Sequence, residues 1–295
     1  MRRPLYAELS CGGSTVRLDG LVGGRGLHVT SEGIEGWWST PDPKWSLTER
    51  QSADGAHDVS DGMALYTART VTVHVVAAGR DRDDTRSLLD ALLAMAHGRA
   101  RLRVVDSSED TFCEGLVSVH AGAEWRSCAI LAAVTLTCPD PRRLATEPSD
   151  AWLLPAQAHG GGVGLSYGAS GAGLRYPLDY GAGATDSRNS ATVRNAGTAP
   201  AHPVVTLEGP LDAGATVTVS AGGSTATVTV GRAIAGGTSV TVDFRTRTAS
   251  QGRLDVTRQV TATGWAPVPA DGEAACTIQA TGTGSALVRV RDTYI

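Results

Sequence analysis

Valines alternate with polar residues over residues 70–76, where Val71, Val73 and Val75 share one face of the chain. A period of two is typical of a half-buried strand, so this segment is predicted to be a strand with its valine face in a core. Apolar runs predict further strands at 101–105, 115–120 and 128–137. The last run ends at Cys138-Pro-Asp-Pro141 because two prolines remove backbone donors and prevent further pairing.

One segment has the pattern of a helix instead. Apolar residues recur at helical spacing, and acidic residues precede them, where they can cap a helix and favour its first turn. The apolar residues are Leu88, Leu89, Leu92, Leu93 and Ala96, and the acidic ones are Asp81, Asp83 and Asp84. Gly98 stands where a C′ glycine would end the helix. One face of this helix is expected to pack on a sheet.

The second half of the chain has no helical pattern. After a segment rich in Gly, Ala and Ser, short Val/Thr runs recur between Gly-Gly, Asp-Gly and Pro turns, which is typical of a β-sandwich of the jelly-roll kind. The expected strands are 191–194, 204–208, 216–220, 225–230, 239–243, 253–256, 276–279 and 287–291.

The chain is therefore predicted to be mainly β. It is expected to divide into an N-terminal β domain with a single helix (1–145), a linker that includes a docking segment at 173–178 (146–187), and a C-terminal β-sandwich (188–295).

Between Gly36 and Gly62 the alternating pattern stops. This segment holds three of the six Trp residues, Trp37, Trp38 and Trp45, together with many Asp and Ser. A polar loop of this length inside a compact domain usually has a binding role. The segment is therefore a candidate interaction site.

Composition and charge exclude several classes of function. Residues 1–150 carry 16 basic against 21 acidic side chains (net −5) and residues 151–295 carry 10 against 9 (net +1), so neither half has the basic face that nucleic acid requires. The start of the chain lacks the apolar core of a signal peptide, and no apolar run reaches the ~18–20 residues of a transmembrane helix. The five Cys are widely spaced and are expected to be reduced, as in proteins made in a bacterial cytoplasm.

Three possible chemical motifs have simpler interpretations. Gly164-Leu-Ser166-Tyr-Gly168 matches the nucleophile elbow of serine hydrolases, but it lacks the strand and helix that the elbow needs. The acidic cluster at 81–84 could bind a hard cation, yet no ligand with EF-hand spacing follows it and it already suits a helix start. The seven His form no zinc pattern, and His74 and His120 are expected on solvent faces of strands. No catalytic residue, metal site or cofactor is predicted.

Several segments resemble the distal tail protein (Dit-like) family of siphophages. In the N-terminal half the resemblance lies in Asp54-Gly-Ala-His57, in 62–76, in one following helix and in 101–106. In the C-terminal half it lies in 193–203, Glu208-Gly-Pro210, 240–243, Gly264-Trp265 and 288–294. The order of these motifs, which together cover nearly the whole chain, carries the resemblance.

The resemblance implies a structural role without catalysis. It implies a hexameric ring at the distal end of the virion tail, made in the bacterial host cytoplasm, through which DNA passes. The ring would join the tail tube protein to tail-tip, tail-associated or receptor-binding proteins, and its C-terminal sandwich would be galectin-like. Because interfaces favour Trp, Tyr and Arg, the ring contacts are expected at Trp37, Trp38, Trp45, Tyr66 and Arg69.

Two alternatives stay open. One is a carbohydrate-binding sandwich of a tail or cell-wall-associated protein, although the His, Asn, Arg and Trp set with which galectins bind sugar is not present and Trp265 is expected in the core. The other, less favoured, is a serine hydrolase that acts through Ser166. Glycan binding by residues 188–295 would favour the first, and labelling by a fluorophosphonate would favour the second.

Overall fold

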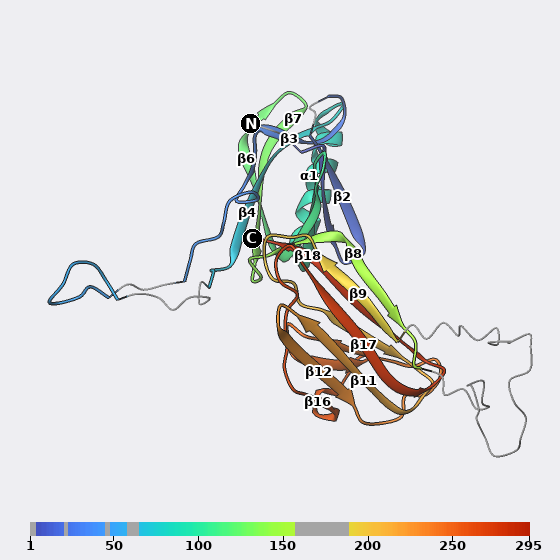
Figure 1. Cartoon of the computed structure of the whole chain (residues 1–295). Helices are drawn as coiled ribbons and strands as arrows, with labels where there is room; N and C mark the ends of the chain where they lie inside the picture. The colour runs from blue at the N-terminus through green and yellow to red at the C-terminus, as the bar shows by residue number, and fades with distance from the viewer. Residues whose placement is uncertain (1–3, 21–22, 45–47, 58–64, 157–188) are drawn as a thin grey trace, which may run out of the picture. The chain divides into compact units, whose positions relative to one another are not determined.

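The computed structural model describes residues 4–20, 23–44, 48–57, 65–156 and 189–295. They form two compact units. The first contains the chain up to Glu147 together with Thr293–Ile295, and the second contains Pro148–Asp292. The architecture is mainly β, as predicted, and the described residues contain one α-helix, α1 (Arg82–Leu93) (Figure 1).

The first unit is a β-barrel. Its strands are β1 (Tyr6–Cys11), β2 (Ser14–Asp19), β3 (Gly26–Glu35), β4 (Arg69–Ala78), β5 (Arg99–Val105), β6 (Asp110–Arg126) and β7 (Ala129–Cys138). They pair in the order β6-β5-β1-β2-β3-β4-β7, and β7 pairs again with β6, which closes the sheet on itself. The bridge between Asp19 and His28, which joins β2 to β3, is parallel, whereas the neighbouring pairings are antiparallel.

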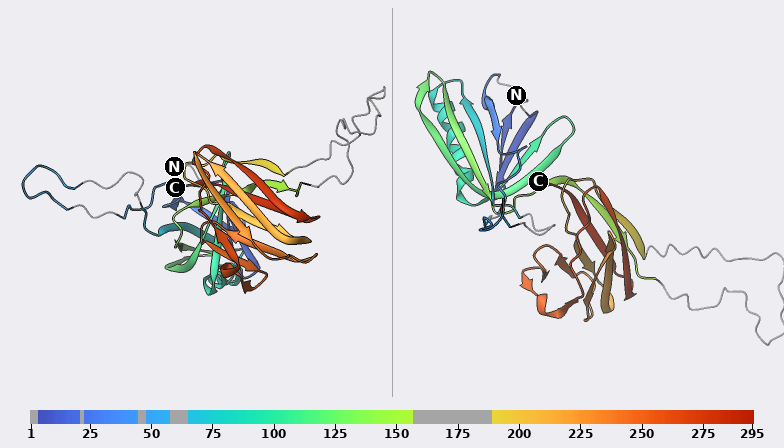
Figure 2. Two further views of the ribbon diagram at one scale, coloured as in Figure 1. Left: turned by 60° about the horizontal axis from the view of Figure 1, so that its bottom comes forward. Right: turned by 60° about the vertical axis from the view of Figure 1, so that its left-hand side comes forward.

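The core of the barrel follows the predicted alternation. Val71, Val73 and Val75 of β4 are at most 1% exposed, and the polar residues between them lie on the opposite face. Leu89 and Leu92 of α1 join the same apolar core, where the helix packs against β4 and β7. Figure 2 shows α1 running alongside the barrel strands.

Local hydrogen bonds explain where the helix begins and ends. The Asp81 side chain accepts a hydrogen bond from the Asp84 N–H at 2.8 Å, which is the capping role predicted from the sequence. The Thr85 hydroxyl donates to the Cys128 carbonyl at 2.6 Å and anchors the first turn. The helix ends in a 3₁₀ turn, η1 (Ala94–His97). The prediction of a C′ glycine is wrong, because this turn ends the helix and Gly98 is extended (φ −167°).

The chain leaves the barrel later than predicted. β7 ends at Cys138, as the two prolines after it require. However, Arg143–Leu153 form a further strand, β8, so residues 146–153 of the predicted linker are strand. Its first part pairs with β6, and its last inward residues belong to the core of the second unit. The docking segment predicted at 173–178 lies outside the described residues.

The second unit is a two-sheet sandwich. One sheet has the order β15-β14-β13-β10-β18 with β8 beside β18, and the other has the order β16-β12-β11-β17-β9. Apolar residues of both sheets form one core. The strands are β9 (Ser190–Asn195), β10 (Val204–Glu208), β11 (Leu211–Ala221), β12 (Ser224–Val230), β13 (Ser239–Asp243), β14 (Thr248–Gln251), β15 (Leu254–Asp255), β16 (Val260–Ala262), β17 (Gly272–Gly282) and β18 (Ser285–Tyr294), with a 3₁₀ turn η2 (Thr257–Gln259) before β16.

The sequence located the longer strands of this sandwich and missed two short ones, β14 and β16. β14 has four residues, of which only Ala249 is buried, so it shows no apolar alternation. Trp265 packs on the core, as expected, with its ring edge-to-face with Phe244 at 5.3 Å between centroids.

Candidate functional site

The described residues between 36 and 68 form an arm that leaves the barrel between β3 and β4. Its outgoing and returning sides run antiparallel and are joined by backbone hydrogen bonds. These are Lys44 N–H to Leu65 O (2.6 Å), Thr67 N–H to Asp42 O (2.8 Å), His57 N–H to Thr48 O (2.9 Å) and Arg50 N–H to Gly55 O (2.9 Å). Within residues 48–57, Glu49 and Ala56 form an antiparallel bridge.

Arg69 holds the root of this arm. Its side chain is 2% exposed, and its guanidinium donates to the carbonyl oxygens of Gly36 (2.6 Å), Ser39 (2.7 Å) and Pro141 (2.6 Å). Burial, followed by the nearby charge of Arg143, lowers the pKa of Arg69. The first residues of the arm, the start of β4 and the segment after β7 are therefore fixed to one another.

Trp37 lies in the same buried region. It is 1% exposed, belongs to the barrel core, and has the Arg143 guanidinium 5.6 Å from its ring centre. Neither Trp37 nor Arg69 places its side chain on the surface of the unit. Both side chains support the root of the arm, and the expected contact of these two residues with a neighbouring copy stays a prediction.

The other predicted interface residues differ from Trp37 and Arg69 in their exposure. Trp38 is 45% exposed, and Leu65, which lies opposite Lys44 on the returning side, is 62% exposed. Tyr66 is half-buried and forms a bridge with Pro43. Trp45 lies outside the described residues. Trp38 and Tyr66 stay predicted contact residues, and Leu65 is a candidate that the sequence reasoning missed because a lone leucine in a polar loop gives no periodic signal.

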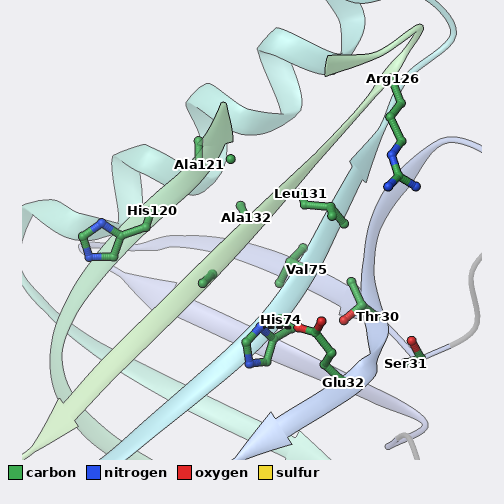
Figure 3. A pocket seen from close by; sticks show the side chains of 12 residues that line it. Thr30, Ser31, Glu32, His74, Val75, His120, Ala121, Arg126, Leu131 and Ala132 are labelled. Atoms are coloured by element: carbon green, nitrogen blue, oxygen red, sulfur yellow. Dashed lines mark ion pairs between the residues drawn. The ribbon is translucent and has the colours of Figure 1, made fainter. Parts of the chain in front are cut away.

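A second feature is a hollow of about 500 Å³ on the face of β4, β7 and β6 that points away from the core (Figure 3). The strand register places both His74 of β4 and His120 of β6 opposite Ala133 of β7. The small side chain of Ala133 therefore leaves a space between two imidazoles. His74 and His120 lie on the outward face, as predicted, but their separation along the chain does not reveal that they lie in one row.

Two irregularities in the strands shape the walls of the hollow. The β3–β4 register passes from Val29 opposite Val75 to Ile34 opposite Val73, so residues 30–33 leave the ladder. Thr30, Ser31 and Glu32 consequently form one wall. A second register shift, between residues 121 and 125 of β6, precedes Arg126 at the tip of the β6–β7 hairpin.

His74 is held by carboxylates of the first wall. Its Nδ1 lies 2.8 Å from Glu32 Oε2. Its Nε2 lies 3.4 Å from Glu35 Oε1 and makes no hydrogen bond within the described structure. The ring is 22% exposed, whereas both carboxylates are about two-thirds exposed.

Asp81 and Asp84, in the acidic cluster at the start of α1, accept hydrogen bonds that hold the helix in place. Arg25 Nε donates to both carboxylate oxygens of Asp84 (2.9 and 2.8 Å). Together with the Arg80 N–H, it lowers the pKa of Asp84 to about 2. Among the residues that the structure describes, no group of His, Cys, Asp and Glu is suited to a metal ion. Ser166 lies outside the described residues.

Within the described ranges, no helix is both long enough and apolar enough to cross a membrane.

Comparison with known proteins identifies the fold. No protein-family model and no curated protein matches the sequence. The crystal structure of the phage SPP1 Dit (gp 19.1) protein, described as a paradigm of the hub adsorption apparatus in phages that infect Gram-positive bacteria, matches with a TM-score of 0.56 at 12% identity, over 91% of this chain and 94% of that one. A chain of the phage p2 baseplate in its activated conformation with Sr matches with a TM-score of 0.51 at 8% identity, over 97% of each chain. The resemblance first seen in the sequence motifs is therefore confirmed in three dimensions: this chain has the fold of a Dit-like phage tail hub protein.

Proposed function

We propose that the chain is a structural component of the phage tail tip. It would form a ring, with six copies as the expected number, at the distal end of a siphophage tail. The ring would join the tail tube protein to tail-tip, tail-associated or receptor-binding proteins and let DNA pass through its centre. No catalytic activity is part of this role.

The observation that best supports the proposal is the arm between β3 and β4. Its two described sides are hydrogen-bonded to each other, and Trp38 and Leu65 on it are exposed. Extended backbone and large apolar side chains in water are costly unless a partner covers them. The root, in contrast, is fixed by Arg69 and Trp37. An arm whose root is fixed and which exposes two large apolar side chains is suited to contact a neighbouring copy.

Two further observations support this assignment. The match to the SPP1 Dit protein extends over both units of the chain, so it does not rest on one common β-sandwich. The N-terminal half carries a net charge of −5, which suits a channel through which DNA slides without being held. Virion location and assembly with other tail proteins follow from the same proposal.

Light scattering and electron microscopy of the purified full chain test the ring. We expect ring-shaped oligomers, either alone at high concentration or on the ends of tail tubes. Trp38→Ala combined with Leu65→Ser should reduce ring formation at least about tenfold, since interface aromatics contribute about 2 kcal/mol or more. Leu254→Ser, which changes a 69% exposed leucine of the other unit, is the matched control.

A strictly monomeric chain at every concentration, with no ring in tail tips isolated from virions, would refute the proposal. Equal ring formation by the Trp38/Leu65 double variant and the Leu254 variant would refute the role of the arm while leaving the ring itself intact.

Glycan binding by the sandwich is a second candidate, favoured by one observation. Trp152 on β8 is 51% exposed and Leu154 is 41% exposed, which gives the sandwich an outward aromatic side chain on which a sugar ring could stack. Binding of host cell-wall polysaccharide that is lost in Trp152→Ala would support this function. Binding that is unchanged by the substitution would remove its structural basis.

A further inference from the structure

We infer that the outer face of β4 and β7 receives the arm of a second copy of this chain, with Trp38 of the second copy in the hollow beside His74. This inference rests on the proposed ring, and it names the surface that the arm contacts there. The receiving surface consists of the side chains of the β4–β7 ladder that point away from the core, and we call it the neutral face.

The neutral face has no charged residue along its ladder. Leu131 of this face is 48% exposed, and Leu116, which extends the face onto β6, is 65% exposed. Charged residues are depleted at the centres of protein interfaces, and apolar side chains that gather on one exposed face mark interaction sites. The composition of this face therefore suits burial against a partner. Its five cross-strand pairs, none of which contains Asp, Glu, Lys or Arg, are Thr70–Thr137, Thr72–Thr135, His74–Ala133, Val76–Leu131 and Ala78–Ala129.

A different part of the same barrel surface is rich in ion pairs. On β1, β5 and residues 110–114 of β6, Arg103 lies 3.0 Å from Glu8 and 2.6 Å from Asp110. Arg101 lies 2.7 Å from Glu114. Partly exposed ion pairs are tolerated in water, whereas covering them with a partner would cost the hydration of both charges. The contrast indicates that the ion-paired face stays in water and that the neutral face is covered on assembly.

The hollow gives the neutral face a recess for one large side chain. Its volume of about 500 Å³ falls within the ~300–1,000 Å³ of pockets that enclose small molecules, so it has room for an indole ring. Ala132 and Ala133 line it with small side chains, and Figure 3 shows Arg126, His74 and Glu32 around it. The Arg126 guanidinium and the His74 imidazole can pack on an indole, and the Glu32 carboxylate can accept its N–H. These groups together suit a tryptophan.

The arm of the same copy cannot fill this hollow. Arg69 donates to the carbonyl oxygens of Gly36 (2.6 Å) and Ser39 (2.7 Å). The backbone on both sides of Trp38 is therefore fixed beside the first residue of β4. His74 lies five residues farther along this strand, which corresponds to about 17 Å. Because this exceeds the length of a Trp side chain, Trp38 can reach such a hollow only on another copy.

A contact of this kind is suited to a ring. The arm and the neutral face are different surfaces of one barrel unit, so each copy can offer its arm to one neighbour and receive the arm of the other. Head-to-tail contacts of this type form closed rings when the rotation between copies closes. An aromatic side chain seated in a recess is also the usual anchor of an interface.

Chemical cross-linking of the full chain tests the contact directly. Ser39→Cys places a thiol beside Trp38, which is kept, and Ala133→Cys places a second thiol on the floor of the hollow. With a short bismaleimide, the double variant should give a ladder of covalent dimers and larger species that neither single variant gives. Mass spectrometry should find position 39 of one copy joined to position 133 of another. A link within one chain would assign the hollow to the chain's own arm and overturn the inference.

Filling the hollow is the second test. Ala133→Leu should reduce ring formation at least about tenfold, as Trp38→Ala should, and the two together should cost no more than either alone because both remove one contact. Thr15→Leu, which adds the same side chain at an exposed position of β2, is the matched control and should leave ring formation unchanged. Thermal unfolding at the wild-type temperature checks folding. If Ala133→Leu fails that check, Leu131→Ser, at an exposed leucine of the same face, replaces it with the same expected loss.

The outcomes distinguish this inference from the ring itself. Wild-type rings that give no cross-link, together with equal ring formation by Ala133→Leu and Thr15→Leu, would overturn the contact while the ring stands. Additive losses when Trp38→Ala and Ala133→Leu are combined would show that Trp38 binds elsewhere. A wild-type chain that forms no oligomer, either alone or on tail tubes, would refute both the ring and the contact.

Discussion

The Arg69 guanidinium donates a hydrogen bond of 2.6 Å to the carbonyl oxygen of Gly36, and this contact closes the base of the arm. Gly36 is the first residue after β3 and Arg69 is the first residue of β4. The bond therefore joins the two points at which the arm leaves and re-enters the barrel.

Arg69→Met should destabilise the chain by about 3 kcal/mol, because it removes a charged donor and leaves several buried carbonyl oxygens unpaired. Urea unfolding measures the change. Arg50→Met, at the exposed arm tip, is the matched control and should cost less than about 0.5 kcal/mol. Equal stability of the two variants would show that the carbonyl oxygens find other partners.

Gly36→Ala tests the root of the arm at the residue whose carbonyl oxygen accepts the bond from Arg69. Gly36 has φ +77°, and a Cβ there would lie 2.2 Å from the Thr70 carbonyl oxygen. Backbone strain and this collision should together cost about 2 kcal/mol or more. Gly55→Ala, with φ +80° and no atom within 4 Å, isolates the strain alone and should cost about 1 kcal/mol or less.

Trp37 and Trp38 should behave oppositely although they are adjacent. Trp37→Ala removes a side chain from the barrel core and should cost about 3–5 kcal/mol in thermal or urea unfolding. Trp38→Ala should leave the unfolding of the monomer nearly unchanged and weaken assembly instead. Equal destabilisation by both would show that Trp38 also packs on the barrel.

The Arg25–Asp84 pair predicts a pH dependence with a defined sign. The pKa of Asp84 is held at about 2, below the ~3.9 of a free aspartate, so the pair contributes stability that is present above ~4 and is lost as pH falls toward 2. Asp84→Asn should therefore melt at a lower temperature than the wild type at pH 7, and the difference should disappear near pH 2. Asp54→Asn, at the arm tip, should show no such difference at either pH.

An element could be predicted from the sequence only where its residues follow a regular apolar pattern. Alternation located β4 because one face of it is buried, and helical spacing with an aspartate cap located α1. The arm has no period, so nothing in the sequence distinguished buried Trp37 from exposed Trp38. The hollow was not predictable either, since it depends on the register that places His74 and His120 on either side of Ala133.

The course of β8 limits how the chain can be divided. Its residues up to Glu147 belong to the first unit, and Ala151 and Leu153 are buried in the core of the second. A fragment that starts at residue 188 would therefore lack part of its own interior. Recombination between related tail genes, or the design of a chimaeric tail tip, would need its junction between Glu147 and Pro148, inside a strand and not in a loop, and would also have to supply Thr293–Ile295, which belong to the first unit.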